Sequence, residues 1–186
     1  MILKNCIKKG KVIIVFSIFI ICLISCGENV IEEKTEEIQE VEEIQGVQKI
    51  KNDMGKQPWV VNIEETTIIN DNYRIATWTG EYLQLVYMSL EPGDNIDLEL
   101  HNDHDQFIRI EKGKARILMG KTKDNLSFDK EVSDDWAILI PAGYWHEVRN
   151  IGNSELKLYT IYGPPEHPKG TINKTYSDAE EHHHNH

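Results

Sequence analysis

The chain has 186 residues, of which 40% are hydrophobic, and it carries 20 basic and 31 acidic side chains for a formal net charge of −11. That length holds one domain with a real core and is short for two. The acidic balance argues against nucleic-acid binding and against electrostatic docking on anionic lipid.

The N-terminal segment predicts a lipoprotein signal peptide over residues 1–26. "MILKNCIKKGK" holds four lysines and no acid, and the apolar run "VIIVFSIFIICLIS" is too short to span a bilayer comfortably. The segment ends in "LISC", which resembles the lipobox of bacterial lipoproteins, with Cys26 as the lipidated residue. An uncleaved N-terminal membrane helix is the alternative. In either case we expect the rest of the chain on the extracytoplasmic side of the cell membrane. In the lipoprotein the lipid anchor would hold it there.

The cysteines and glutamates separate this segment from the rest of the chain. All three cysteines lie within residues 1–26, so the rest has no disulfide and no thiolate metal site. Eight glutamates fall between Glu28 and Glu43. Because this charge density opposes a packed core, residues 27–57 are predicted to form an acidic, flexible linker.

Short runs of strand-forming residues begin at Trp59. They are "WVVNI", "YRIATWTG", "LQLVYMSL", "IDLELH", "QFIRIE", "KARILMG", "WAILIP", "HEVRNI" and "LKLYTIY". Turn signals such as "EPGDN", "EKGK" and "PAG" separate them, which predicts an all-β sandwich or barrel over residues 58–178. The polar, histidine-rich end, residues 179–186, is expected to be disordered.

The run "IDLELH" places polar groups on one side of a strand. Strict alternation puts Ile96, Leu98 and Leu100 on one face and Asp97, Glu99 and His101 on the other. Two carboxylates and an imidazole on a shared face can line a pocket. Further along the chain, "PAGYWH" forms a Pro/Gly turn that delivers His146 to the start of another strand.

The spacing of these residues resembles two motifs of the cupin family. The first motif, G-x5-H-x-H-x4-E-x6-G, is matched in every interval by Gly93, Glu99, His101, Gln106 and Gly113. The second, G-x5-P-x-G-x2-H-x3-N, is matched by Asp135 in place of the opening glycine, then Pro141, Gly143, His146 and Asn150. The resemblance covers residues 58–178 and is strongest to small single-domain bacterial cupins described as mannose-6-phosphate-isomerase-like.

The resemblance implies a fold and a metal site. The fold would be the cupin jelly roll, a double-stranded β-helix of antiparallel strands. The ligands of a divalent metal (Mn, Fe, Ni or Zn) would be Glu99, His101 and His146, with Gln106 as a possible fourth. Glu99 replaces the family's first histidine and Gln106 its glutamate. Two imidazoles and one carboxylate with open positions suit Mn(II) or Fe(II) better than a closed zinc site.

Several alternatives stay open for these side chains. Glu99 and His101 could be a hydrogen-bonded pair in a filled barrel, and His146 a core histidine. If Glu99 does not bind the metal, it would serve as a general acid or base, and no residue is assigned a catalytic role. His104 lies three residues beyond His101, where the motif places no ligand. We therefore expect His104 at the rim or in solvent.

The predicted function is a membrane-anchored cupin that binds or transforms a small oxygen-rich molecule, a sugar or a carboxylate, at a divalent-metal site. Isomerase, decarboxylase and dioxygenase chemistry fit this description equally well. The alternative is a non-catalytic, ligand-binding cupin lipoprotein without metal. Because cupins commonly pair through their outer sheets, a homodimer is also expected.

Overall fold

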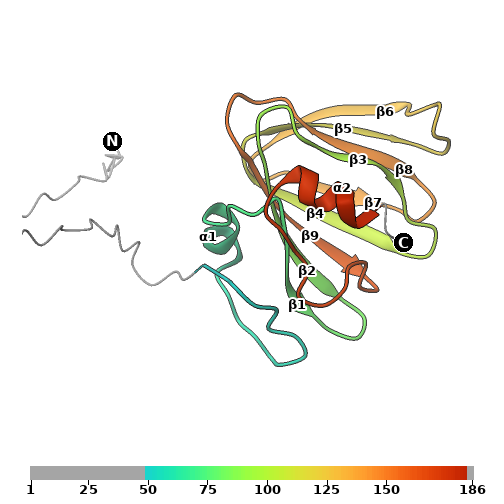
Figure 1. The fold of residues 1–186 in the computed structure, drawn as a ribbon. Coiled ribbons are helices and arrows are strands. Elements are labelled where there is room, and N and C mark those ends of the chain that lie inside the picture. Colours follow the sequence, from blue (N-terminus) through green and yellow to red (C-terminus); the bar gives the residue numbers. More distant parts are fainter. Residues whose placement is uncertain (1–48, 184–186) are drawn as a thin grey trace, which may run out of the picture. The chain divides into compact units, whose positions relative to one another are not determined.

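The computed structural model of the protein describes residues 49–183 and folds them into two facing β-sheets with two helices (Figure 1). The six-stranded sheet has the order β10-β1-β2-β9-β4-β7 and the four-stranded sheet the order β3-β8-β5-β6. The strands of both sheets pair antiparallel, so the predicted all-β architecture is confirmed. The strands are β1 (Arg74–Thr79), β2 (Gln84–Leu90), β3 (Asn95–Leu100), β4 (Asp105–Lys112), β5 (Lys114–Gly120), β6 (Phe128–Ser133), β7 (Ala137–Ile140), β8 (Trp145–Asn150), β9 (Leu156–Gly163) and β10 (Ile172–Asn173), and the helices are α1 (Ile63–Ile68) and α2 (Tyr176–His183).

The core lies between the two sheets. Alternate residues of β2, β4 and β9 point into it, for example Met88, Ile110 and Leu158, each fully buried. A smaller cluster on the outer face of the six-stranded sheet contains Ile75 and Tyr87 and is covered by α1. The inward-facing rows therefore create the closed interior in which a site can form.

Helix α1 replaces the first predicted strand. The run "WVVNI" is not a strand in the structure: residues 59–62 are irregular and the helix begins at Ile63. The side chain of Asn62 accepts a hydrogen bond from the backbone N–H of Glu65, which makes Asn62 the N-cap of the helix. This local capping, together with the tertiary packing of α1, outweighs the strand propensity of the two valines.

The ends of the domain differ from the predicted boundaries. The signal peptide, Cys26 and most of the predicted linker lie outside the described residues. Within the described part of that linker, Met54 N donates to Thr77 O at 2.7 Å, so the chain is already held against β1. At the other end, α2 begins before the predicted tail, and Ala179 is buried in the core. Across residues 49–183 no helix has the length and apolarity to cross a membrane.

Asp53 fixes the N-terminal segment to the domain. Its carboxylate accepts hydrogen bonds from the backbone N–H groups of Gly55 at 2.8 Å, Thr79 at 3.0 Å and Gly170 at 3.2 Å, and from the Thr79 hydroxyl. Burial raises the pKa of Asp53, but these hydrogen bonds lower it more, so the pKa in the folded protein is below 3.8. The ionised carboxylate therefore stabilises the folded protein at pH values above 3.8. This stabilisation is lost as the pH falls through the lower pKa of the folded state.

We expect Asp53→Asn to lower the unfolding free energy by about 1–2 kcal/mol near neutral pH, because the amide loses charge-assisted hydrogen bonds. The difference from the wild type should shrink as the pH falls below the unfolded value of 3.8, because the unfolded chain takes up the proton first, and it should disappear below the lower folded pKa. Urea unfolding at about pH 6 and about pH 3 measures both quantities. Asp134→Asn, at an exposed aspartate, is the matched control. A difference independent of pH would contradict this account.

Two turns of the second motif have the backbone that their residues require. Asp135 occupies the position of the glycine that opens the second motif. Its φ is +70°, a left-handed conformation that aspartate tolerates better than most residues. Gly143 has φ +74°, and its N–H donates to the carbonyl of His101 at 2.7 Å. The turn before β8 is thereby fixed next to His101, which brings the two motifs together.

Candidate metal centre

A β-bulge decides which side chains of β3 face the interior. Ile96 pairs with Val148 of β8, whereas Glu99 pairs with His146, so three steps on β3 match two steps on β8. Ile96 belongs to the core, and Glu99 turns inward as well. The strict alternation that placed Ile96 and Glu99 on opposite faces is therefore wrong, because the extra residue shifts the register.

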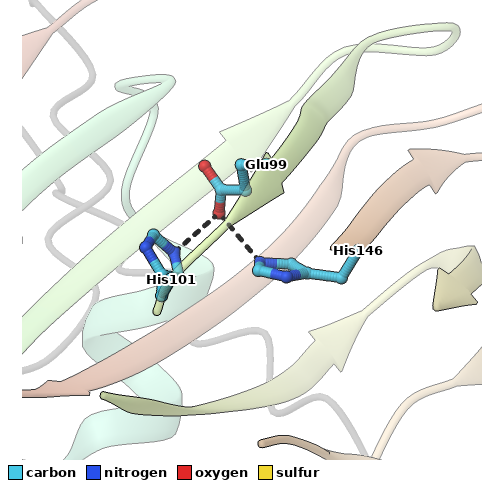
Figure 2. Close-up of side chains that lie close together, drawn as sticks. All are labelled: Glu99, His101 and His146. Carbon is cyan, nitrogen blue, oxygen red and sulfur yellow. Dashed lines mark hydrogen bonds and ion pairs between the residues drawn. The ribbon is translucent and has the colours of Figure 1, made fainter. Parts of the chain in front are cut away.

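Glu99, His101 and His146 form a compact cluster (Figure 2). Glu99 Oε1 lies 3.3 Å from His101 Nε2 and 3.1 Å from His146 Nε2. His146 is 1% exposed and His101 is 9% exposed, while the carboxylate of Glu99 is half-buried. The three residues come from β3, from its end and from β8, so the fold unites the two motifs in one site.

The spacing of these donor atoms fits a metal ion. Neighbouring ligands of an octahedral ion, each about 2.1 Å from the metal, lie about 3 Å apart. The two separations from Glu99 Oε1, 3.3 and 3.1 Å, are close to this value. Imidazole and carboxylate are also the ligands that Mn(II), Fe(II) and Zn(II) accept. The residues present therefore fit a divalent metal.

The hydrogen bonds of His146 give a second, independent test. Its Nδ1 lies 3.0 Å from the carbonyl oxygen of Tyr144, which can only accept, so Nδ1 carries a proton. In the neutral ring Nε2 then has a lone pair, and that lone pair is aimed at the Glu99 carboxylate, another acceptor. A cation at this point, either a second proton on the ring or a metal ion, removes the conflict. A backbone carbonyl that orients a ligand histidine in this way is characteristic of metal sites.

The electrostatics of the cluster favour charged groups. Burial raises the pKa of Glu99, but hydrogen bonds and charge from His101 and His146 lower it more, so its pKa lies well below the ordinary range. Burial lowers the pKa of His101, but the hydrogen bond to Glu99 and the charges of Glu99 and Glu166 raise it more. The carboxylate is therefore ionised and attracts positive charge to the space between the rings.

Gln106 is buried on β4, but its side chain forms its hydrogen bond away from the three clustered residues. Its side-chain N–H group donates to the hydroxyl of Thr160 at 3.0 Å. The amide oxygen, which is the atom that binds metals, is buried without a hydrogen-bond partner among the described residues. The structure thus brings together three of the four predicted ligands, and the role of Gln106 stays a prediction.

His104 is not a rim or solvent histidine, and this expectation is wrong. It is 6% exposed, and its ring stacks on that of His101 with centroids 4.4 Å apart. Residues 101–104 form a bend rather than a strand, so the alternation that would separate the two rings does not apply. His104 Nε2 lies 3.4 Å from Glu166 Oε2, which is itself 3.7 Å from His101 Nδ1.

Glu166 is a site residue that the sequence analysis missed. It lies in the loop after β9, and with His101 and His104 it forms a second cluster of potential ligands. The stretch "PPEHPKG" held a signal, since prolines on both sides fix the loop that carries Glu166. Only the fold could place that loop beside His101.

Two facing antiparallel sheets with a histidine–carboxylate cluster between them define a small-barrel protein with a candidate metal centre. Residues 86–162 match the family model described as the cupin domain, and the chain belongs to the cupin family. The predicted cupin jelly roll is thereby confirmed.

Relatives of high identity support this assignment. The uncharacterized protein YrkC of Bacillus subtilis is 52% identical over 127 residues, which cover 68% of each chain. The uncharacterized protein L612 of Acanthamoeba polyphaga mimivirus is 48% identical over 117 residues, which cover 62% of this chain and 71% of the relative. The crystal structure of BH2720 from Bacillus halodurans is 52% identical, with a TM-score of 0.69, and the match covers 70% of this chain and 98% of that chain.

Proposed function

We propose that this protein is a lipid-anchored, extracytoplasmic cupin that holds a divalent metal on Glu99, His101 and His146 and there binds or transforms a small oxygen-rich molecule. The observation that carries the metal site is the conflict between His146 Nε2 and the Glu99 carboxylate, which a cation resolves. A bound Mn(II) or Fe(II) supplies Lewis-acid polarisation of a ligand oxygen.

The chain's own residues prepare the site for such a molecule. The Tyr144 carbonyl fixes the orientation of His146, and Glu166 lies within ion-pair distance of His101 and His104. The Tyr162 ring packs edge-on against His101, with centroids 5.8 Å apart, and shields the cluster from one side. A preorganised centre of this kind suits isomerase, decarboxylase and dioxygenase chemistry.

The signal-peptide pattern of residues 1–26 supports the proposed location. Phosphorylated sugars are mainly cytosolic, so an extracytoplasmic position disfavours a mannose-6-phosphate-isomerase-like activity within this family. Cell fractionation tests the anchor: the wild-type chain should be recovered with the membranes, and Cys26→Ser should prevent lipidation and the anchoring that depends on it. The chain is also proposed to form a homodimer, and sedimentation velocity of the purified protein should then show a dimer rather than a monomer.

The metal site is tested by elemental analysis of the purified protein. The four histidines at the C-terminus, His182, His183, His184 and His186, are first replaced by glutamine, because a histidine-rich end chelates metal itself. We expect close to one Mn, Fe, Ni or Zn per chain.

The matched variant is His101→Ala combined with His146→Ala, which should contain no more than traces of metal. Absence of metal from the parent after incubation with each ion would contradict the metal site. The cluster would then act as a ligand pocket in a metal-free, non-catalytic lipoprotein, with Glu99 hydrogen-bonded to His101 and His146.

A further inference from the structure

A cavity of about 300 Å³ lies on the open side between the two sheets, beneath α2. It is bounded by Tyr73 and Arg74 of the β1 region, by Glu99 of β3 and by Tyr176 of α2. Glu99 therefore contacts the two histidines of the candidate metal centre and also lines this cavity. The volume is at the lower end of that found for small-molecule pockets.

Arg74 is a buried cation at the wall of this cavity. It is 6% exposed, and it lies on the same face of β1 as the core residue Ala76, opposite Met88 of β2. Its Nε is buried without a hydrogen-bond partner, and no ion pair found within residues 49–183 includes this guanidinium. The Arg74 guanidinium lies over the face of the Tyr73 ring, with its Cζ 5.5 Å from the ring centroid. A cation–π contact satisfies none of the five N–H donors.

The acidic side chains around the cavity form their hydrogen bonds with groups other than Arg74. Asp97 Oδ1 lies 2.8 Å from the Tyr176 hydroxyl, and Glu180 Oε1 lies 3.0 Å from the same group. Glu99 is held between His101 and His146. Nε alone of this guanidinium is both shut off from water and unpaired, so the two terminal nitrogens are accessible from the cavity, where the counter-ion that a ligand brings can pair with them.

We propose that Arg74 binds the carboxylate of a small hydroxy acid or oxo acid that enters this cavity and whose second oxygen faces the Glu99–His101–His146 centre. This inference rests on the proposed function and narrows its substrate class from oxygen-rich molecules to carboxylates. A planar guanidinium matches a carboxylate with two parallel hydrogen bonds. A phosphate dianion fits less well, because a single cation faces it while Asp97, Glu99 and Glu180 repel it.

The position of Arg74 near Tyr162 supports a link between Arg74 and the candidate metal centre. The positive charge of Arg74 acts on the Tyr162 hydroxyl, where it opposes the rise in pKa caused mainly by burial. The ring of Tyr162 in turn contacts both His101 and His104. A small acid held by Arg74 is therefore next to Glu99, the one candidate ligand that lines this cavity.

The test is calorimetric titration of the metal-loaded full chain with sodium glycolate, with its neutral counterpart ethylene glycol and with inorganic phosphate. We expect saturable glycolate binding by the wild type, weaker binding of phosphate and none of ethylene glycol. Arg74→Met should weaken glycolate binding by about tenfold or more, because it removes charge-assisted hydrogen bonds. Arg116→Met removes the same charge from an exposed pair with Asp129 and should bind glycolate like the wild type.

Several results would overturn the inference. These are the absence of glycolate binding by the wild type, equal glycolate affinity in Arg74→Met, and phosphate binding tighter than glycolate binding. Urea unfolding without ligand adds a readout that separates ligand binding from a structural role. Arg74→Met should unfold at a urea concentration equal to or above that of the wild type, because it removes an unpaired buried charge. A clear fall in the midpoint would assign Arg74 a structural role and overturn the inference.

The two proposals fail in different ways. If Arg74→Met retains wild-type metal content but glycolate affinity is unchanged, the ligand inference fails and the metal site stands. If the wild type holds no metal but binds glycolate through Arg74, the metal site fails and the carboxylate-binding role of Arg74 stands.

Discussion

Asn150→Ala is expected to lower the unfolding free energy by about 3 kcal/mol, because one buried and three partly buried backbone groups lose their partner at once. Asn150 is 5% exposed at the end of β8. Its side-chain N–H group donates to the carbonyls of Leu90 at 2.9 Å, Glu91 at 3.0 Å and Ser154 at 2.9 Å, and its Oδ1 accepts from Gly152 N at 2.9 Å. One side chain thus joins the end of β2 to the loop before β9.

Urea unfolding followed by tryptophan fluorescence measures this loss. Asn153→Ala, at an exposed asparagine in the same loop, is the matched control and should change the unfolding free energy by less than about 0.5 kcal/mol. A loss below about 1 kcal/mol in Asn150→Ala would show that water replaces the amide at these carbonyls. In that case Asn150 would not be needed to hold the end of β2 to the loop before β9.

Glu99→Gln is expected to weaken divalent-metal binding by about 100-fold or more. The change removes the negative charge from the donor that lies 3.3 and 3.1 Å from the two histidine nitrogens. Even residues that only orient a ligand cost about 10- to 100-fold in metal affinity when replaced, and a charged ligand should cost at least as much. Competition with a chelator of known affinity measures the change.

Thermal unfolding adds a second readout for the same variant. A metal that binds only the folded state stabilises it by about 2.7 kcal/mol at 100 times its dissociation constant, so wild-type Tm should rise with added Mn(II). Glu99→Gln should lose most of this rise, whereas Glu131→Gln, which removes a charge from exposed β6, should keep it. Equal shifts in Glu99→Gln and the wild type would exclude Glu99 as a ligand.

Local sequence signals allowed the fold class to be predicted, and the resemblance to two motifs far apart in the chain allowed most of the candidate centre to be predicted. Strand runs separated by Pro/Gly turns are local signals, and eight of the nine predicted runs correspond to strands of the structure. The resemblance to the two cupin motifs implied that Glu99, His101 and His146 share one site, and the structure brings the three together. The exception is "WVVNI", which is not a strand because Asn62 caps helix α1 at this point.

The sequence by itself determined an all-β domain of paired strands and named three residues that meet in its interior. Only the tertiary structure decided what surrounds them. The bulge in β3 depends on its pairing with β8, and the burial of His104 depends on a bend whose ring stacks on His101. Glu166 and Arg74 come to the site from distant strands and loops. Alternation and spacing describe neighbours along a strand, whereas these contacts arise from packing two sheets and a helix around a common interior.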